Sequence, residues 1–492
     1  MSLLNLPMHR VILGAAAVLA IPVLGCGGDG SPPSGPGNQV QIVKQSGDAQ
    51  TGPLGGTAQP YRVKVTDENG FGKPGVAVSW TIVCGAGAIS ADTSVTDASG
   101  VASITATLPA AAGAQSVTAS VAGASGSPVL FTSRASAPGA FAVSGGGNNV
   151  PERYSSDLWV AGGYAYTGTW NWYQRTSGVL GQVKIFQLGT GGAPTLIDSV
   201  SLANVVTVSD LQVSPDGQWL VVTAEGGSAE GLYVYSLADP AHPAQQAFYG
   251  VGTGLHTGSL SVIGGKLYAF TAKNPGSPAL MIFDLSDLAN GNITLASSTP
   301  IPPNYGIHDT FIRDGICFAF VWNEGVYIYD VGKGVAGGSP QAPVQLGSVK
   351  TSGGEAHNGW WFWNPVTGEK RYLFVGQEGP GAVGSSSSGD IHVVDVSDLT
   401  APKEVGTYHM QGAGTHNFWM DEARQRLYAA YYNGGVVALD VSCDLAGDLG
   451  FREIARIQPG GSGQTYTWGV MLSGSSLYAI DMLSGLWQLA VP

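Results

Sequence analysis

The chain has 492 residues, of which 11% are charged and 74 are glycine, and its formal net charge is -13. This acidity, without a cluster of Lys and Arg, excludes nucleic acid as a partner, because phosphate binding depends on basic side chains. No long segment has helical periodicity and glycine supplies turn dihedrals, so we expect an all-β protein.

The N-terminus has the pattern of an export signal. His9 and Arg10 precede an apolar run over residues 11–25, which is short for a membrane span but typical of a signal peptide. The run ends in Val23-Leu24-Gly25-Cys26, which resembles the bacterial lipobox. The resemblance implies a signal peptide over residues 1–26 and a lipid on Cys26, and Gly27 in place of Asp favours the outer membrane. Residues 27–37 are rich in Gly, Pro and Ser and predict a flexible tether.

Residues 38–137 predict a β-sandwich, because short alternating strands recur between turn residues. Two turns, Asp67 to Gly70 and Asp97 to Gly100, combine an aspartate that caps its own backbone with a glycine suited to positive φ. Together with Pro74-Gly75-Val76 and the stretch 119–123, they resemble the bacterial Ig-like group 1 domain of intimin- and invasin-type surface proteins. That family implies a spacer or adhesive module.

From residue 140 to residue 492 the chain repeats one unit, most legible over residues 305–331. Each unit has apolar strands separated by turns that contain Gly, Asp or Asn. Seven copies at a spacing of roughly 50 residues indicate a β-propeller of four-stranded blades. The last copy ends at its third strand, so we expect the strand near Phe141 to complete blade seven and close the ring.

The third strands and the turns after them resemble the LVIVD repeat of bacterial surface propellers. The best copies are the stretches 282–287 and 393–402, whereas Gln187 and Ser236 replace the aspartate in the first two blades. We interpret this aspartate as structural, closing the turn. Three cysteines, Cys84, Cys317 and Cys443, are too dispersed to predict a disulfide framework or a zinc site, and we expect buried thiols.

Four of the eight histidines fall at or near one register of the repeat, where the first strand of a blade enters the central channel: His256, His308, His357 and His416. Aspartate or asparagine marks the same register, at Asp157, Asp210, Asp309, Asn358 and Asn417. Turns expected at this end carry Glu225, Glu324 and Glu378, and a nearby loop carries Trp170 and Trp172, which could stack on a sugar or an aromatic ligand.

Three interpretations of this register stay open. Neutral imidazoles that converge on an axis could bind a transition-metal ion, with carboxylates orienting their second nitrogens; this architecture resembles the metal centres of carotenoid-cleaving oxygenases and selenium-binding-type propellers. The pairs could instead cap strands, each His bonding a neighbouring blade and each Asp or Asn its own turn. The third interpretation is a metal-free polar ligand pocket.

Because both resembled families are display modules, we expect a lipid-anchored outer-membrane protein that faces the periplasm or the cell surface. Its propeller face would recognise a glycan, an envelope polymer or a protein without catalysis. The alternative is a metal-dependent oxidase, oxygenase or hydrolase that uses the histidines.

Overall fold

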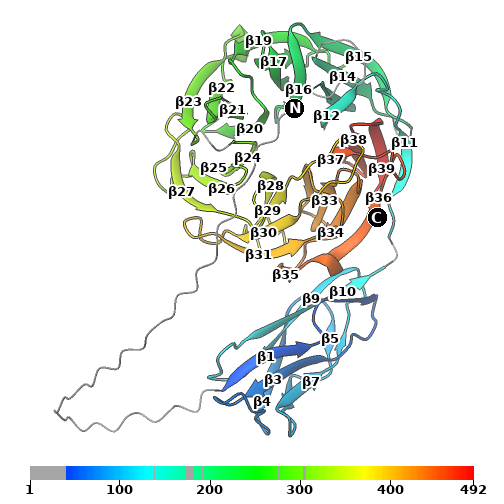
Figure 1. Ribbon diagram of the computed structural model, residues 1–492, viewed down its shortest axis with the longest axis vertical. Helices are drawn as coiled ribbons and strands as arrows, with labels where there is room; N and C mark the ends of the chain where they lie inside the picture. Colours follow the sequence, from blue (N-terminus) through cyan, green and yellow to red (C-terminus); the bar gives the residue numbers. More distant parts are fainter. Residues whose placement is uncertain (1–39, 138, 172–180, 190–191, 275, 303–305) are drawn as a thin grey trace, which may run out of the picture.

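The computed structural model describes residues 40–137, 139–171, 181–189, 192–274, 276–302 and 306–492. These residues form an all-β Ig-like sandwich followed by a seven-bladed propeller (Figure 1), which confirms the predicted fold class. Within these ranges no helix is long and apolar enough to cross a membrane.

The Ig-like domain packs a three-stranded sheet, β1-β3-β7, against a five-stranded sheet, β2-β10-β9-β4-β6. The bounds are β1 (Gln41–Ser46), β2 (Gln50–Pro53), β3 (Tyr61–Thr66), β4 (Ala77–Cys84), β6 (Thr93–Val95), β7 (Val101–Ile104), β9 (Gly113–Ser120) and β10 (Val129–Ser136), with a small β5 (Ala88–Ile89) and β8 (Ala106–Thr107) pair. Alternate residues such as Tyr61, Val63 and Val65 are fully buried between the sheets, as period-2 patterning predicts.

Both predicted turns are confirmed. Asp67 Oδ1 accepts the N–H of Asn69 at 2.9 Å, and Asp97 Oδ1 accepts that of Ser99 at 2.8 Å. Gly70 and Gly100 have φ of 82° and 79°, a conformation that costs other residues a steric clash.

Each blade places its first strand nearest the channel (Figure 1). Blades one to three comprise β12 (Tyr154–Ala161), β13 (Tyr164–Trp170), β14 (Gly181–Gln187) and β15 (Thr195–Leu202); β16 (Val205–Val213), β17 (Trp219–Gly227), β18 (Gly231–Ser236) and β19 (Ala244–Gly250); and β20 (Thr257–Ile263), β21 (Lys266–Lys273), β22 (Ala279–Asp284) and β23 (Thr294–Pro300), the last preceded by the 3-10 turn η1 (Leu288–Asn290).

Blades four to six continue the pattern. They comprise β24 (Asp309–Arg313), β25 (Ile316–Phe320), β26 (Val326–Asp330) and β27 (Val344–Val349); β28 (Ala356–Phe362), β29 (Tyr372–Gln377), β30 (Ile391–Asp395) and β31 (Lys403–Tyr408), extended by β35 (Gly447–Asp448); and β32 (Phe418–Asp421), β33 (Arg426–Ala430), β34 (Val436–Asp440) and β36 (Glu453–Ile457), with the 3-10 turn η2 (Gly450–Arg452) before β36.

Blade seven confirms the predicted closure. It is formed by β37 (Thr467–Ser473), β38 (Ser476–Asp481) and β39 (Gly485–Ala490), with β11 (Ala142–Gly146) as its outer strand (Figure 1). Ala142 pairs with Ala490 and Val143 with Leu489. The last strand of the chain therefore has no open edge on this side.

Seven hydrophobic clusters hold the ring, each shared by two neighbouring blades. Successive residues of one strand serve opposite neighbours: Cys317 packs towards blade three and Phe318 towards blade five. Both faces of a blade are thus buried, which explains why the central strands are continuous apolar runs. Cys317 is a free buried thiol, as predicted.

The aspartates after the third strands close turns, as the repeat predicts. Asp284, Asp395 and Asp440 each accept the N–H of the residue two positions later. Asp330 accepts backbone N–H groups from Gly332, Lys333, Gly334, Ala336 and Gly338.

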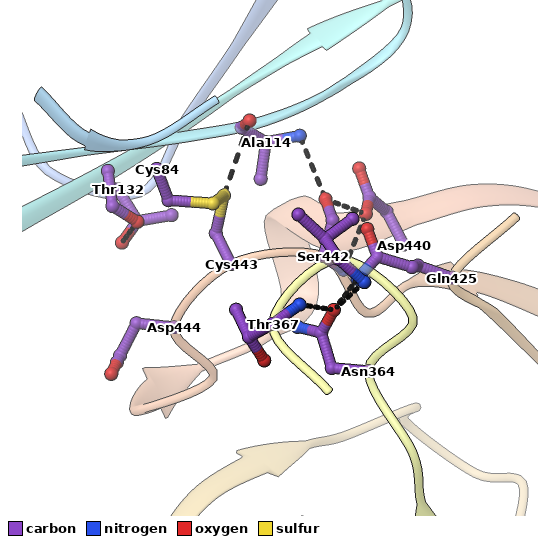
Figure 2. Close-up of a disulfide and its surroundings, with 12 residues drawn as sticks. Cys84, Ala114, Thr132, Asn364, Thr367, Gln425, Asp440, Ser442, Cys443 and Asp444 are labelled. Carbon is purple, nitrogen blue, oxygen red and sulfur yellow. Dashed lines mark hydrogen bonds between the residues drawn. A yellow bond between two sulfur atoms is a disulfide. The ribbon is translucent and has the colours of Figure 1, made fainter. Parts of the chain in front are cut away.

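The prediction of three buried thiols is wrong for two of them. Cys84, at the end of β4, forms a disulfide with Cys443, in the loop after β34, with a Cα–Cα distance of 5.7 Å (Figure 2). The two lie 359 residues apart in the sequence, and only the docking of the Ig-like domain on blade six brings them together.

Further contacts accompany the disulfide. The Ser442 hydroxyl accepts the N–H of Ala114 at 3.1 Å (Figure 2). Arg134, 2% exposed, donates to the Glu453 carbonyl at 3.0 Å, and its Nε lies 3.3 Å from Asp440 Oδ2. A covalent bond and a buried ion pair therefore fasten the two domains together.

Candidate functional site in the propeller channel

Local backbone irregularities place the predicted residues. In blades one, two, five and seven the ladder between the first two strands shifts register at the predicted position, beside Asp157, Asp210, Asn358 and Gly469. Such β-bulges re-aim side chains. In blade two the successive residues Ser209 and Asp210 consequently line the same cavity of about 20 Å³ in the channel, a volume that holds roughly one water molecule. His308 with Asp309 and His416 with Asn417 line it too, from the points where the first strands of blades four and six begin.

The structure brings all four predicted histidines together, a set that we call the histidine layer: His256, His308, His357 and His416. Neighbouring ring centroids lie 4.2, 3.9 and 4.1 Å apart in that order. His256 Nε2 and His308 Nε2 approach to 2.7 Å. His308, His357 and His416 are buried, with His357 1% and His416 2% exposed, and His256 is half-buried, so the layer lies inside the channel.

Hydrogen bonds at the second nitrogen orient two of the rings. His256 Nδ1 lies 2.7 Å from Glu225 Oε1, which also accepts the Ser209 hydroxyl at 2.6 Å. His416 Nδ1 donates to the Trp468 carbonyl at 2.6 Å. A proton held on Nδ1 leaves the lone pair on Nε2, and this is the arrangement that metal-binding imidazoles use.

Glu378 lies against the same layer. Its carboxylate oxygens are 3.8 Å from His308 Nε2, 3.7 Å from His357 Nε2 and 3.9 Å from His416 Nε2. The Tyr432 hydroxyl donates to the same carboxylate. Ligand atoms of His308, His357 and Glu378 all lie within 4.8 Å of one another, so small rotations would let them share one ion.

Burial keeps most of these rings neutral. It lowers the pKa of His357 to about 3 and, with the neighbouring imidazoles, holds the pKa of His308 and His416 well below the usual range. Burial also lowers the pKa of His256, but Glu225 outweighs it and the net shift is upward. Burial raises the pKa of Glu378 to about 7. Neutral imidazole is the form that binds metal.

The strand-cap interpretation explains part of this register. Asp157, Asp210 and Asp309 each accept the N–H of the next residue, and His416 bonds a neighbouring blade's carbonyl. It leaves other buried nitrogens unexplained. Nδ1 of His308, both nitrogens of His357 and Nε2 of His416 are buried without a hydrogen-bond partner, which is costly unless something else binds them.

A second layer crosses the channel next to the first, and we call it the acid–amide layer: Asp157, Asp210, Asp309, Asn358 and Asn417. Its members bond across blades, as in Asn417 Nδ2 to Asp157 Oδ2 at 3.1 Å and Gly258 N to Asp210 Oδ2 at 2.9 Å. Burial and the neighbouring Asp210 raise the pKa of Asp157, and burial raises that of Asp309 to about 7.

Beyond the acid–amide layer lies a cavity of about 440 Å³, which we call the aromatic cavity. Its wall includes Trp159, Phe311, Trp360 and Trp419. Neither this cavity nor its four aromatic residues was predicted from the sequence. The signal was present, because each of these aromatics stands two positions after an Asp or Asn of the layer and therefore on the same face of its strand.

Of the remaining predicted residues, Trp170 lies against the histidine layer. The prediction of a loop at Trp170 is wrong, because Trp170 is the last residue of β13. It packs on His256 and Trp468, with centroids 6.1 and 5.1 Å away. Glu324 lies 3.9 Å from Lys350 in a partly exposed pair and has no contact with the histidine layer among the described interactions. Trp172 and Cys26 lie outside the described residues.

Comparison with known proteins supports the domain assignment. Residues 53–133 match the bacterial Ig-like domain (group 1), and residues 152–173 and 386–410 match the LVIVD repeat. The chain therefore joins a group 1 Ig-like domain to an LVIVD-repeat propeller. These two domains suggest a binding or protein-interaction module.

Two solved structures show a distant similarity to the chain. The β-propeller domain of Cps50 (Swd1) from Myceliophteria thermophila gives a TM-score of 0.49 at 11% identity, covering 70% of this chain and 98% of that chain. Sqt1 from Chaetomium thermophilum gives 0.48 at 12% identity, covering 69% and 82%. The search of curated proteins found no match.

Proposed function

We propose that the protein is an exported binding protein whose propeller holds one divalent transition-metal ion on the histidine layer. The observation that carries the proposal is the convergence of buried, partly unpartnered imidazole nitrogens on a cavity of about 20 Å³. Glu225 and the Trp468 carbonyl bond the Nδ1 atoms of His256 and His416 and so fix the orientation of these two rings. Metal-binding histidines are commonly oriented by such hydrogen bonds.

The ligand atoms available in the histidine layer limit which metal ions could bind there. Imidazole ligands suit zinc, iron, copper or nickel, whereas calcium and magnesium prefer oxygen. Glu378 and Glu225 supply two negative charges beside the imidazoles, which balance a divalent ion. An ion held in this way can serve as a Lewis acid or a redox centre, which is the chemistry that the metal-dependent enzyme alternative requires.

Elemental analysis of the purified, tag-free chain tests the proposal. We expect about one equivalent of metal in the wild type and a small fraction of that in the triple variant His308→Ala, His357→Ala, His416→Ala. The control is His242→Ala with His409→Ala, since these two histidines are exposed and pair with Asp198 and Asp390. Metal retained by the triple variant, or no uptake by the wild type after incubation with each ion, would contradict the proposal.

A second variant tests the metal site with a smaller change to the buried structure, in case the triple variant does not fold. Glu225→Gln keeps the side-chain size but removes the carboxylate behind His256, and loss of such a support typically weakens metal affinity about 10–100-fold. Unchanged affinity in a competition with a chelating dye would show that Glu225 does not support a metal ligand.

We further propose that Cys26 carries a lipid that anchors the protein in the outer membrane, on the strength of the Val23-Leu24-Gly25-Cys26 sequence. The Cys84–Cys443 disulfide supports export, because disulfides persist in oxidising compartments. Incorporation of labelled palmitate into the wild type and its loss in Cys26→Ser would support the anchor. Equal labelling of both would exclude it.

A further inference from the structure

We infer that the aromatic cavity binds a small organic cation, such as an amine or a quaternary ammonium compound. The cavity has a volume of about 440 Å³, within the range of sites for small molecules. Its floor is the acid–amide layer and its wall carries Trp159, Phe311, Trp360 and Trp419. The inference is independent of the metal proposed above, because the histidine layer lies on the far side of the acid–amide layer.

The charged residues that line the cavity indicate which class of ligand it would bind. Asp157, Asp210 and Asp309 line the cavity, and Arg313 is the only Lys or Arg among its described lining residues. Arg313 is already neutralised, since its Nη1 lies 2.5 Å from Glu422 Oε1. A metal ion on the histidine layer would be balanced by Glu225 and Glu378 on its own side. The floor thus offers three carboxyl groups, and the described lining residues include no uncompensated basic side chain, so a cation is the complementary ligand.

The wall suits a cation as well. Trp360 and Trp419 lie edge to face with centroids 5.3 Å apart, and Trp419 meets Trp159 in the same way at 6.0 Å. The Arg313 guanidinium already lies over Phe311 and Trp360, at 5.4 and 5.9 Å from the ring centroids. These two rings therefore already carry a cation, and a ligand would lie against Trp159 and Trp419, as an ammonium group does in an aromatic cage.

Isothermal titration calorimetry of the full chain with choline and with its uncharged isostere 3,3-dimethylbutan-1-ol tests the inference without any variant. We expect choline to bind at least about tenfold more tightly, because only the cation gains from the carboxylates and the ring faces. Equal binding of the two would show an apolar cavity, and no binding of choline or of putrescine would show no cation site. Either result would overturn the inference.

Variants then locate the site. Trp419→Ala should lower choline affinity at least about tenfold, whereas Trp363→Ala, on an exposed tryptophan outside the cavity, should not change it. The triple histidine variant should keep choline binding, which separates a failure of this inference from a failure of the metal proposal. Undiminished binding in Trp419→Ala would place the ligand elsewhere and overturn the assignment of this cavity.

Discussion

The Ig-like domain and the propeller channel use the same side chain, aspartate, in opposite environments. Asp97 lies at the surface of the Ig-like domain, where hydrogen bonds from Ser99 and Val101 lower its pKa. Asp157 and Asp309 are surrounded by protein in the channel and reach solvent only through the cavity, and burial raises their pKa. In the first domain an acid stabilises a turn, whereas in the second it carries a desolvation cost.

The difference supports our proposal that the propeller channel, and not the Ig-like domain, binds a ligand. A turn aspartate needs no further partner, and the described interior of the Ig-like domain holds an apolar cluster with a few buried polar groups such as Ser133 and Arg134, but no buried histidine or aspartate. The channel instead collects acids and histidines whose burial opposes folding. The seven interblade clusters must offset that cost, and a bound cation would relieve it. The comparison leads to four predictions, which we give in order of decreasing effect.

The largest effect should come from opening the ring that supports the channel. Replacing residues 140–148 by a Gly/Ser segment of equal length removes β11 and leaves the outer edge of β39 unpaired, whereas its ladder with β38 remains. We expect the propeller transition in calorimetry to fall by more than about 10 °C, since a whole ladder and the Phe141 contact with Tyr428 are lost. An unchanged melting curve would show that closure does not depend on β11.

The next effect concerns the joint between the two domains. The double variant Cys84→Ser, Cys443→Ser should weaken docking of the Ig-like domain by about 2–4 kcal/mol and leave each domain folded. Small-angle scattering should show a wider particle, and limited proteolysis faster cleavage near residue 138. Identical scattering curves would mean that the Arg134–Asp440 pair suffices. A variant of the free Cys317, Cys317→Ala, is the control.

Asp330 is buried, as the channel aspartates are, but it closes a turn, as Asp97 does. A variant at this position therefore tests whether burial or hydrogen bonding determines what an aspartate contributes to stability. Burial raises its pKa, but the backbone N–H groups outweigh this and lower it to about 2. A lowered pKa means stability that is present above pH 4 and lost as the pH falls towards 2. Asp330→Asn should cost about 2 kcal/mol at pH 7 and less at pH 2.5. Denaturant unfolding at both pH values measures this, and a cost independent of pH would refute the electrostatic explanation.

The smallest effect should come from the exposed turn of the Ig-like domain. Asp97→Ala removes an acceptor for Ser99 and Val101, but water replaces it, so we expect the melting temperature to change by at most about 2 °C. Asp97→Asn, which can accept the same bonds, is the matched control. A large loss in Asp97→Ala would mean that this turn is needed for the Ig-like fold.

Most of the fold could be predicted from the sequence, because blades are local. A period-2 strand, a turn with Gly70 or Asp284, and the next strand are adjacent in the chain, so short-range patterning identifies them. The prediction that the strand near Phe141 completes blade seven followed from counting the strands of the last repeat, which has only three. The register that carries His308, His357 and His416 was visible for the same reason.

Other features depended on the tertiary structure. The pairing of Cys84 with Cys443 requires two domains to dock, and no local pattern encodes a contact across 359 residues. The sequence placed the histidines at one register, but the arrangement of neighbouring blades around the ring decided that His256 and His308 would approach to 2.7 Å. The sequence by itself thus determined the blades and the chemistry that each one carries. The distances between those side chains, and the cavities they enclose, were decided when the ring closed.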